Sequence, residues 1–132
     1  VHGLLQKKKI KGQGRILLLG FTFKENINDI RNTKVIDIYK TLQGYGYHLD
    51  IHDPHARPDD VHHEYGIAIL NKLPNQSDYD AAVLLVGHED YKNMTPETLQ
   101  DILKRDAIVY DMKGIWRFMS LELERFFRYH TL

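Results

Sequence analysis

The sequence predicts an α/β domain with an open, mostly parallel sheet flanked by helices. Continuous apolar runs, which are typical of strands buried on both faces, recur along the chain. Between them lie segments whose apolar residues are spaced as on one face of a helix. Alternation of these two patterns indicates a parallel sheet, and 132 residues are enough for one domain.

The first unit of the predicted domain is a strand, a helix and a second strand. Residues 15–19 form the first apolar run, and residues 34–42 have helical spacing. We expect the glycines of residues 44–46 to end that helix, because glycine readily takes the left-handed C-cap conformation. A second strand over residues 47–53 then ends at Pro54. Together they predict a βαβ unit with a right-handed crossover.

The middle of the chain is less regular. Residues 55–65 are polar and rich in turn formers, so we expect a loop there. Residues 67–70 are expected to form a short strand, and residues 74–77 to begin one or two helical turns. Residues 81–86 are the clearest strand of the sequence.

The last third predicts a helix, a strand and an aromatic tail. Thr95 is expected to cap a helix over residues 96–104, with Pro96 at its first position. Residues 107–111 form a further strand. Apolar residues of the tail after Trp116 are expected to cover the edge of the core: Leu121, Leu123, Phe126 and Phe127.

Composition excludes several classes of function. The 18 basic and 18 acidic residues cancel, so no overall field favours nucleic acid or a membrane surface. Cysteine is absent, which excludes disulfides and a cysteine nucleophile within this chain. No apolar run approaches the roughly 20 residues of a membrane span, and no signal peptide is visible, so we expect a cytoplasmic protein. Because the chain begins with Val, we expect a fragment of a longer protein.

The loop after the first strand carries two cations suited to phosphate. Open α/β sheets bind ligands in loops at the carboxyl ends of their strands. Lys24 can place its ammonium group against a phosphate oxygen, and Arg31 either binds a pyrophosphate or pairs with Asp29 to order the loop. The loops after the neighbouring strands would bring further polar side chains to the same edge: His88, Glu89 and Lys113.

Two other positions near this loop have simple structural explanations. Asn32 or Thr33 is well placed to cap the following helix. Asp53, before Pro54, occupies the position where nucleotide-binding folds place an acid on a ribose. We favour a turn in which Asp53 accepts backbone hydrogen bonds.

The glycines argue against a dinucleotide site. Gly12 and Gly14 precede the first strand, whereas the dinucleotide fingerprint follows a strand and opens a helix. Only Gly20 has that position, and the bulky Phe21 and Phe23 come next. We also expect no metal site, because the spacing of the histidines does not bring ligands together. These histidines are His52, His55, His62, His63 and His88.

These segments resemble the C-terminal domain of the UDP-glucose/GDP-mannose dehydrogenase family. The family pattern is Gly-x-x-Phe-Lys, a spacer, Asp-x-Arg-x-Ser/Thr, a helix, and a strand ending in Asp-Pro. Residues 20–24, 29–33 and 53–54 have this pattern, and residues 111–113 resemble the family's Asp-x-Lys/Arg segment. The resemblance covers about residues 11–116. The spacer and the Lys-Gly ending are most similar to bacterial members that oxidise UDP-N-acetylhexosamines for surface polysaccharides, including capsules.

The resemblance implies a Rossmann-like three-layer domain within a longer oxidoreductase. Such enzymes oxidise the C6 alcohol of a nucleotide sugar to a carboxylate with two molecules of NAD. Their N-terminal NAD domain carries the catalytic cysteine, and a central region dimerises. Residues 1–14 would be a lead-in from those missing domains, and residues 15–132 would bind a UDP- or GDP-sugar. This domain would bind no cofactor itself and, lacking cysteine, would be inactive alone.

The resemblance also implies roles for single residues. Phe23 and Lys24 would contact the diphosphate of a UDP-sugar, and Lys113 would lie near the diphosphate or the sugar. Arg31 would bind substrate through its charge and, with Asp29, order the loop, as would Thr33. No catalytic residue is expected in this chain.

Two alternatives belong to other classes of protein. A non-catalytic regulatory or protein-interaction module of the receiver type would need an acidic cluster after the first strand, where this chain has a basic loop. A free-standing NAD-binding domain would need the glycine fingerprint that is missing here.

Overall fold

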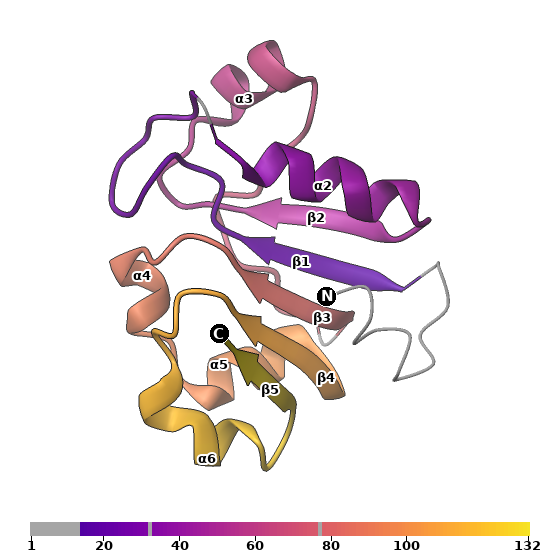
Figure 1. The fold of residues 1–132 in the computed structure, drawn as a ribbon, viewed down its shortest axis with the longest axis vertical. Helices are drawn as coiled ribbons and strands as arrows, with labels where there is room; N and C mark the ends of the chain where they lie inside the picture. The colour runs from indigo at the N-terminus through magenta and orange to yellow at the C-terminus, as the bar shows by residue number, and fades with distance from the viewer. Residues whose placement is uncertain (1–13, 32, 77) are drawn as a thin grey trace.

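The computed structural model describes residues 14–31, 33–76 and 78–132, so the predicted lead-in over residues 1–14 lies outside the described residues except for Gly14 (Figure 1). Five strands form one parallel sheet in the order β2-β1-β3-β4-β5. The strands are β1 (Arg15–Leu19), β2 (His48–His52), β3 (Tyr79–Leu84), β4 (Leu103–Asp111) and β5 (Arg128–Thr131). The helical segments are α2 (Val35–Gly44), α3 (Pro58–Tyr65), α4 (Glu89–Lys92), α5 (Pro96–Ile102), η1 (Arg117–Met119) and α6 (Ser120–Leu123).

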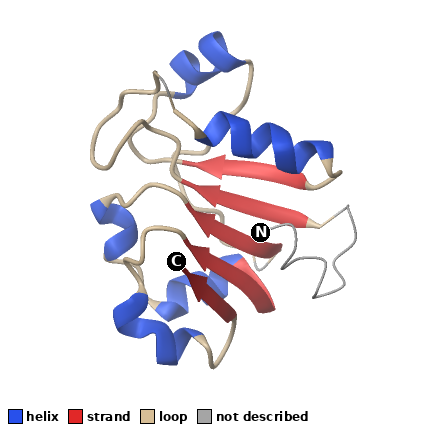
Figure 2. Cartoon of the chain, in the orientation of Figure 1, coloured by secondary structure: helices blue, strands red, loops and turns tan. Residues whose placement is uncertain are grey.

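The helices cover both faces of this sheet, which gives the predicted three layers (Figure 2). Side chains alternate along each strand, so Ile16 and Leu18 of β1 belong to one core, and Leu17 and Leu19 to the other. The first core is closed by α2 and α3, and the second by α4, α5, η1 and α6. The predicted fold class, an open parallel α/β sheet, is confirmed.

The strand order determines where a ligand site can form. From β1 the chain goes first to β2 on one side and then to β3 on the other, so β1 and β3 flank a topological switch point. Ligands of open α/β sheets bind at such points, outside the carboxyl ends of the strands. All five arrowheads in Figure 1 point to the same edge, which therefore gathers the loops after β1, β3 and β4, as predicted.

Several predicted elements are confirmed, with shifted ends. The first strand is β1 as predicted, and the first helix, α2, starts one residue later and ends two residues later than expected. Thr95 caps α5, since its Oγ1 accepts a hydrogen bond from the amide of Thr98 at 3.3 Å. That helix ends at Ile102 rather than at residue 104, because Leu103 already begins β4.

Three expectations for the middle of the chain were wrong. The segment 55–65 contains α3, which begins at Pro58 and is ended by Gly66 in the left-handed conformation (φ +72°). Residues 67–70 form no strand; Leu70 alone makes an isolated bridge to His52. Residues 74–76 form no helix, and Ser77 lies outside the described residues.

The tail also differs from the prediction. It contains β5, which pairs with β4 and was not predicted, because this edge strand has no apolar run. Leu123 and Phe127 are buried in the core as expected, and Phe126 packs against it. Leu121 does not cover the core, since 83% of its surface is exposed.

Within the described residues, no helix has the length and apolar character needed to cross a membrane.

Candidate functional site

The loop after β1 begins at a glycine where any larger residue would be strained. Gly20 has φ +103°, and a Cβ built on it would lie 2.6 Å from Cβ of Val86 and 2.8 Å from its amide nitrogen. Next to it, the amide of Leu85 donates to the carbonyl of Leu19 at 2.9 Å. The loop therefore leaves β1 in direct contact with the segment after β3, at the switch point.

Asp53, at the end of β2, holds the start of this loop. Its fully buried carboxylate accepts hydrogen bonds through Oδ2 from the amides of Phe21 (2.7 Å) and Thr22 (3.0 Å). Through Oδ1 it accepts from the amides of His55 (2.7 Å) and Ala56 (3.1 Å). The prediction that Asp53 accepts backbone hydrogen bonds in a turn is confirmed, and the same side chain also ties the β1 loop to the β2 loop.

The surroundings of Asp53 favour its charged form. Burial alone raises the pKa of this carboxyl, but the hydrogen bond from His88 and those from the amides of Phe21, Thr22 and His55 outweigh it. The resulting pKa is about 2, so Asp53 carries its negative charge throughout the physiological range.

His88, from the loop after β3, holds the far end of the β1 loop. Its buried ring lies with Nε2 2.9 Å from Oδ2 of Asp53 and 3.2 Å from Oγ1 of Thr22. Its Nδ1 accepts a hydrogen bond from the amide of Asn26 at 2.8 Å, and Oδ1 of Asn26 accepts one from the amide of Glu89 at 2.9 Å. Sequence reasoning placed His88 at this edge but did not identify His88 and Asn26 as anchors of the loop.

Phe23 and Lys24 project from the segment between these anchors. Both side chains are exposed, and Phe23 exposes 55% of its surface, which is unusual for a large aromatic residue. The backbone beneath them is held, since Oγ1 of Thr22 donates to the carbonyl of Lys24 at 2.9 Å and the amide of Phe23 donates to the carbonyl of Asp29. An aromatic ring and an ammonium group thus stand on an ordered loop that faces solvent.

Lys113 reaches the same edge from β4. Its exposed side chain has Cβ and Cγ 4.0 Å from the place where a Cβ on Gly87 would lie, so its stem lies beside the loop after β3. Asp111 orders the turn by accepting hydrogen bonds from the amides of Lys113, Gly114, Ile115 and Trp116 and from the hydroxyl of Tyr129. The loops that carry Lys24 and Lys113 therefore contact the same segment, residues 85–89.

Arg31 has a different environment. Its guanidinium is 82% exposed and makes a two-pronged contact with Asp29, with Nε–Oδ1 and Nη2–Oδ2 distances of 3.0 Å. The hydrogen bonds from Arg31 lower the pKa of Asp29. The groove that Arg31 lines is also lined by Asp60 and Glu64 of α3, so two further acids share a groove with this cation. Of the two predicted roles, the described contacts show the pairing with Asp29.

Thr33 orders the entry to α2. Its Oγ1 accepts a hydrogen bond from the amide of Val35 at 3.2 Å, although the N-cap position itself is taken by Lys34. The other predicted cap, Asn32, lies outside the described residues.

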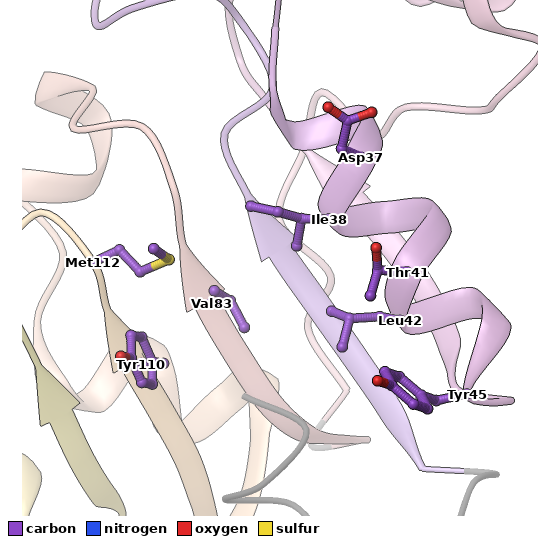
Figure 3. A pocket seen from close by; sticks show the side chains of 8 residues that line it. All are labelled: Asp37, Ile38, Thr41, Leu42, Tyr45, Val83, Tyr110 and Met112. Carbon is purple, nitrogen blue, oxygen red and sulfur yellow. The ribbon is translucent and has the colours of Figure 1, made fainter.

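Another hollow, whose lining is mostly apolar, is unsuited to an anion. It is a groove of about 430 Å³ between α2 and the sheet, and Figure 3 shows its lining side chains. Ile38 and Leu42 line it from α2, and Val83 and Tyr110 line it from β3 and β4. Asp37 is the one charged residue among its described lining, and its charge would repel a phosphate. The sheet edge that carries Lys24 and Lys113 is therefore the better candidate for an anionic ligand.

In the part of the chain that the structure describes, no group of three or more His, Cys, Asp or Glu side chains that could hold a metal ion is found. His52 contacts the hydroxyl of Tyr91 at 2.9 Å, and His55 contacts Asp90 at 2.9 Å. His62 is exposed on α3, as is its neighbour His63.

Comparison with known proteins points to one family. A family model described as the UDP binding domain of the UDP-glucose/GDP-mannose dehydrogenase family matches residues 17–118. The chain is similar to the UDP-N-acetyl-D-glucosamine 6-dehydrogenases of Pseudomonas aeruginosa (42% identity, 86% of this chain) and Salmonella typhi (43%, 83% of this chain). It spans 26% of the length of each of these relatives.

The fold is also similar to that of a solved structure. The NDP-N-acetyl-D-galactosaminuronic acid dehydrogenase from Methanosarcina mazei superposes on 98% of this chain with a TM-score of 0.81 and 22% identity. The match covers 27% of that protein's chain. At this level of identity, the likeness shows a shared fold.

Proposed function

The chain belongs to the UDP-glucose/GDP-mannose dehydrogenase family, of which it is the UDP-binding domain, and we propose that its loops after β1 and β4 bind the diphosphate of a UDP-sugar. The observation that carries this proposal is the placement of Lys24 and Lys113 on two ordered loops that contact the same segment at the switch point. A diphosphate bears about two negative charges, and two ammonium groups are a suitable complement to it.

Each predicted residue has a role in this proposal. Phe23 and Lys24 contact the diphosphate, and Lys113 contacts the diphosphate or the adjacent sugar. Lysine supplies a point charge rather than the two-pronged contact of arginine, so the position of Lys113 tolerates different phosphate geometries. Arg31, held by Asp29, orders the loop and adds positive charge near its end. Thr33 fixes the start of α2.

The activity of the longer protein is part of the same proposal. We infer an NAD-dependent 6-dehydrogenase in which this domain binds the sugar nucleotide, while the remaining domains supply the NAD site, the catalytic cysteine and dimerisation. The names of the two relatives from Pseudomonas aeruginosa and Salmonella typhi favour a UDP-N-acetylhexosamine as substrate. We infer that the product serves as a precursor of surface polysaccharides, including capsules. NAD would not bind to this domain, whose β1 loop has no glycine fingerprint.

Titration calorimetry with UDP on the 132-residue chain tests the role of Lys24. We expect Lys24→Ala to weaken UDP binding about 10-fold, since a charge-assisted hydrogen bond contributes roughly 1.5–3 kcal/mol. Lys40→Ala, which removes an exposed lysine on α2, is the matched control and should leave the affinity unchanged. Equal UDP affinity of Lys24→Ala and the unaltered chain would contradict the proposal.

A further inference from the structure

We propose that His88 is a positioning residue for the diphosphate-binding loop, and that it acts as a neutral ring with its proton on Nε2. Asp53 fixes the start of the loop and His88 fixes its far end at Asn26, so Phe23 and Lys24 lie between two anchors. This inference rests on the proposed function, because it concerns how that loop presents its two ligand-binding side chains.

The hydrogen bonds determine the form of the ring. A backbone amide can only donate, so the contact from the amide of Asn26 requires an unprotonated Nδ1 on His88. The remaining ring proton is then on Nε2, which faces the buried carboxylate of Asp53 at 2.9 Å. An imidazolium ring would turn a second N–H toward that amide and break the contact. His88 thus accepts on the loop side and donates on the Asp53 side.

The ring of His88 has little freedom to adopt another orientation. Its centroid lies 4.5 Å from that of His55 and 5.6 Å from that of Tyr91, so aromatic neighbours pack against it. The amide of Tyr91 also donates to the carbonyl of His88 at 3.0 Å, which fixes the backbone from which the ring projects. The ring is therefore a rigid connection between β2, the β3 loop and the β1 loop.

The hydrogen bond from Asn26 to His88 stabilises an unusual backbone conformation at the end of the loop. Asn26 has φ +61°, a left-handed conformation that asparagine tolerates better than most residues but that is not its lowest-energy state. Two hydrogen bonds hold it there. The backbone amide of Asn26 donates to His88, and the side chain of Asn26 accepts from the amide of Glu89. Without the acceptor on His88, we expect Asn26 to leave this conformation and Lys24 to lose its fixed position.

Two substitutions separate the two functions of the ring. In His88→Asn, the amide oxygen lies near the position of Nδ1, so the acceptor for the Asn26 amide is kept and the donor to Asp53 is lost. In His88→Gln, the amide group reaches the position of Nε2, so the donor is kept and the acceptor is lost. Both replace a buried ring by a smaller side chain, and thermal unfolding of each variant measures that shared cost.

The readouts are UDP affinity by calorimetry and nuclear magnetic resonance of the ring nitrogens and of the Asn26 amide. We expect His88→Asn to bind UDP within about 3-fold of the unaltered chain and His88→Gln to bind about 10-fold more weakly, a difference of one hydrogen bond. In the unaltered chain we expect the Nε2–H form of His88 and slow hydrogen exchange of the Asn26 amide.

Equal UDP affinity of both variants and the unaltered chain would overturn the inference. A proton on Nδ1 of His88 at neutral pH, or rapid exchange of the Asn26 amide, would overturn it as well. These two spectroscopic results need no ligand, so they decide the inference even if the chain binds no UDP, an outcome that would count against the proposed function instead.

Discussion

The carboxylate of Asp53 accepts hydrogen bonds from four backbone amides, two in the loop after β1 and two in the loop after its own strand. Both carboxylate oxygens are buried, and each accepts hydrogen bonds. The backbone amides can only donate, and the ring of His88 also acts as a donor here. Such a group stabilises the fold only in its ionised form. The free energy of unfolding should therefore depend measurably on pH because of this one residue.

We expect Asp53 to contribute about 2 kcal/mol to the free energy of unfolding, because its pKa is about 2 in the folded chain and 3.8 ordinarily. This contribution is present above pH 4 and is lost as the pH falls toward 2. The sign follows from proton binding: between these values the unfolded chain binds more protons, so acid favours unfolding. Urea unfolding at pH 6, 4 and 2.5 measures the effect.

The matched variants for this experiment are Asp53→Asn and Asp101→Asn, since Asp101 is exposed on α5. We expect Asp53→Asn to lower stability at pH 6 and to lose part of the dependence on pH, whereas Asp101→Asn keeps both. The same pH dependence in Asp53→Asn as in the unaltered chain would show that the carboxylate is not the group responsible.

The sequence predicted some of these residues and missed others for a physical reason. Asp53 directly follows β2 and precedes a proline, and Lys24 lies in the loop after β1, so their positions at the sheet edge follow from local patterns. The contact between Asn26 and His88 joins residues 62 positions apart and depends on the pairing of β1 with β3. The local feature that marks Asn26 is its left-handed backbone conformation, and the sequence alone does not report φ.

Among the elements, burial decided what could be predicted. β1 and β3 are buried on both faces and appear as apolar runs, although β3 begins and ends two residues before the predicted strand. β5 lies at the edge of the sheet and pairs through its backbone with β4, so its polar sequence resembles a loop. α3 buries Val61 alone and was missed for the same reason.

Gly20 provides a test of how tightly the β1 loop packs on β3. We expect Gly20→Ala to destabilise the fold by more than about 2 kcal/mol, because it combines a positive φ with a backbone clash at Val86. Gly44→Ala is the matched control: nothing lies within 4 Å of its Cβ position, and alanine stabilises a helix by about 0.5 kcal/mol or more. Chemical denaturation measures both variants.

A small effect of Gly20→Ala, similar to that of Gly44→Ala, would show that the β1 loop does not lie against β3 as described. In that case the two lysine-bearing loops would also lose their common neighbour, the segment 85–89, on which the candidate site depends.

At the scale of the whole molecule, the site follows from topology. The sheet order brings the ends of β1, β3 and β4 together, and each of these ends is followed by a loop that a buried side chain holds in place (Figure 1). The domain spans about a quarter of its relatives' length, and the proposed division of labour leaves chemistry to the remaining domains. In that proposal, this chain supplies a preformed surface for an anionic part of the substrate.

The central claim is that UDP binds at this edge of the sheet, and amide chemical-shift mapping during a UDP titration of the 132-residue chain tests it most directly. We expect saturable shifts in three segments, residues 21–26, 87–89 and 112–115, with the amide of Lys24 among the largest. Saturable shifts confined instead to the groove beneath α2, at Ile38, Leu42 and Tyr110 (Figure 3), would contradict the claim.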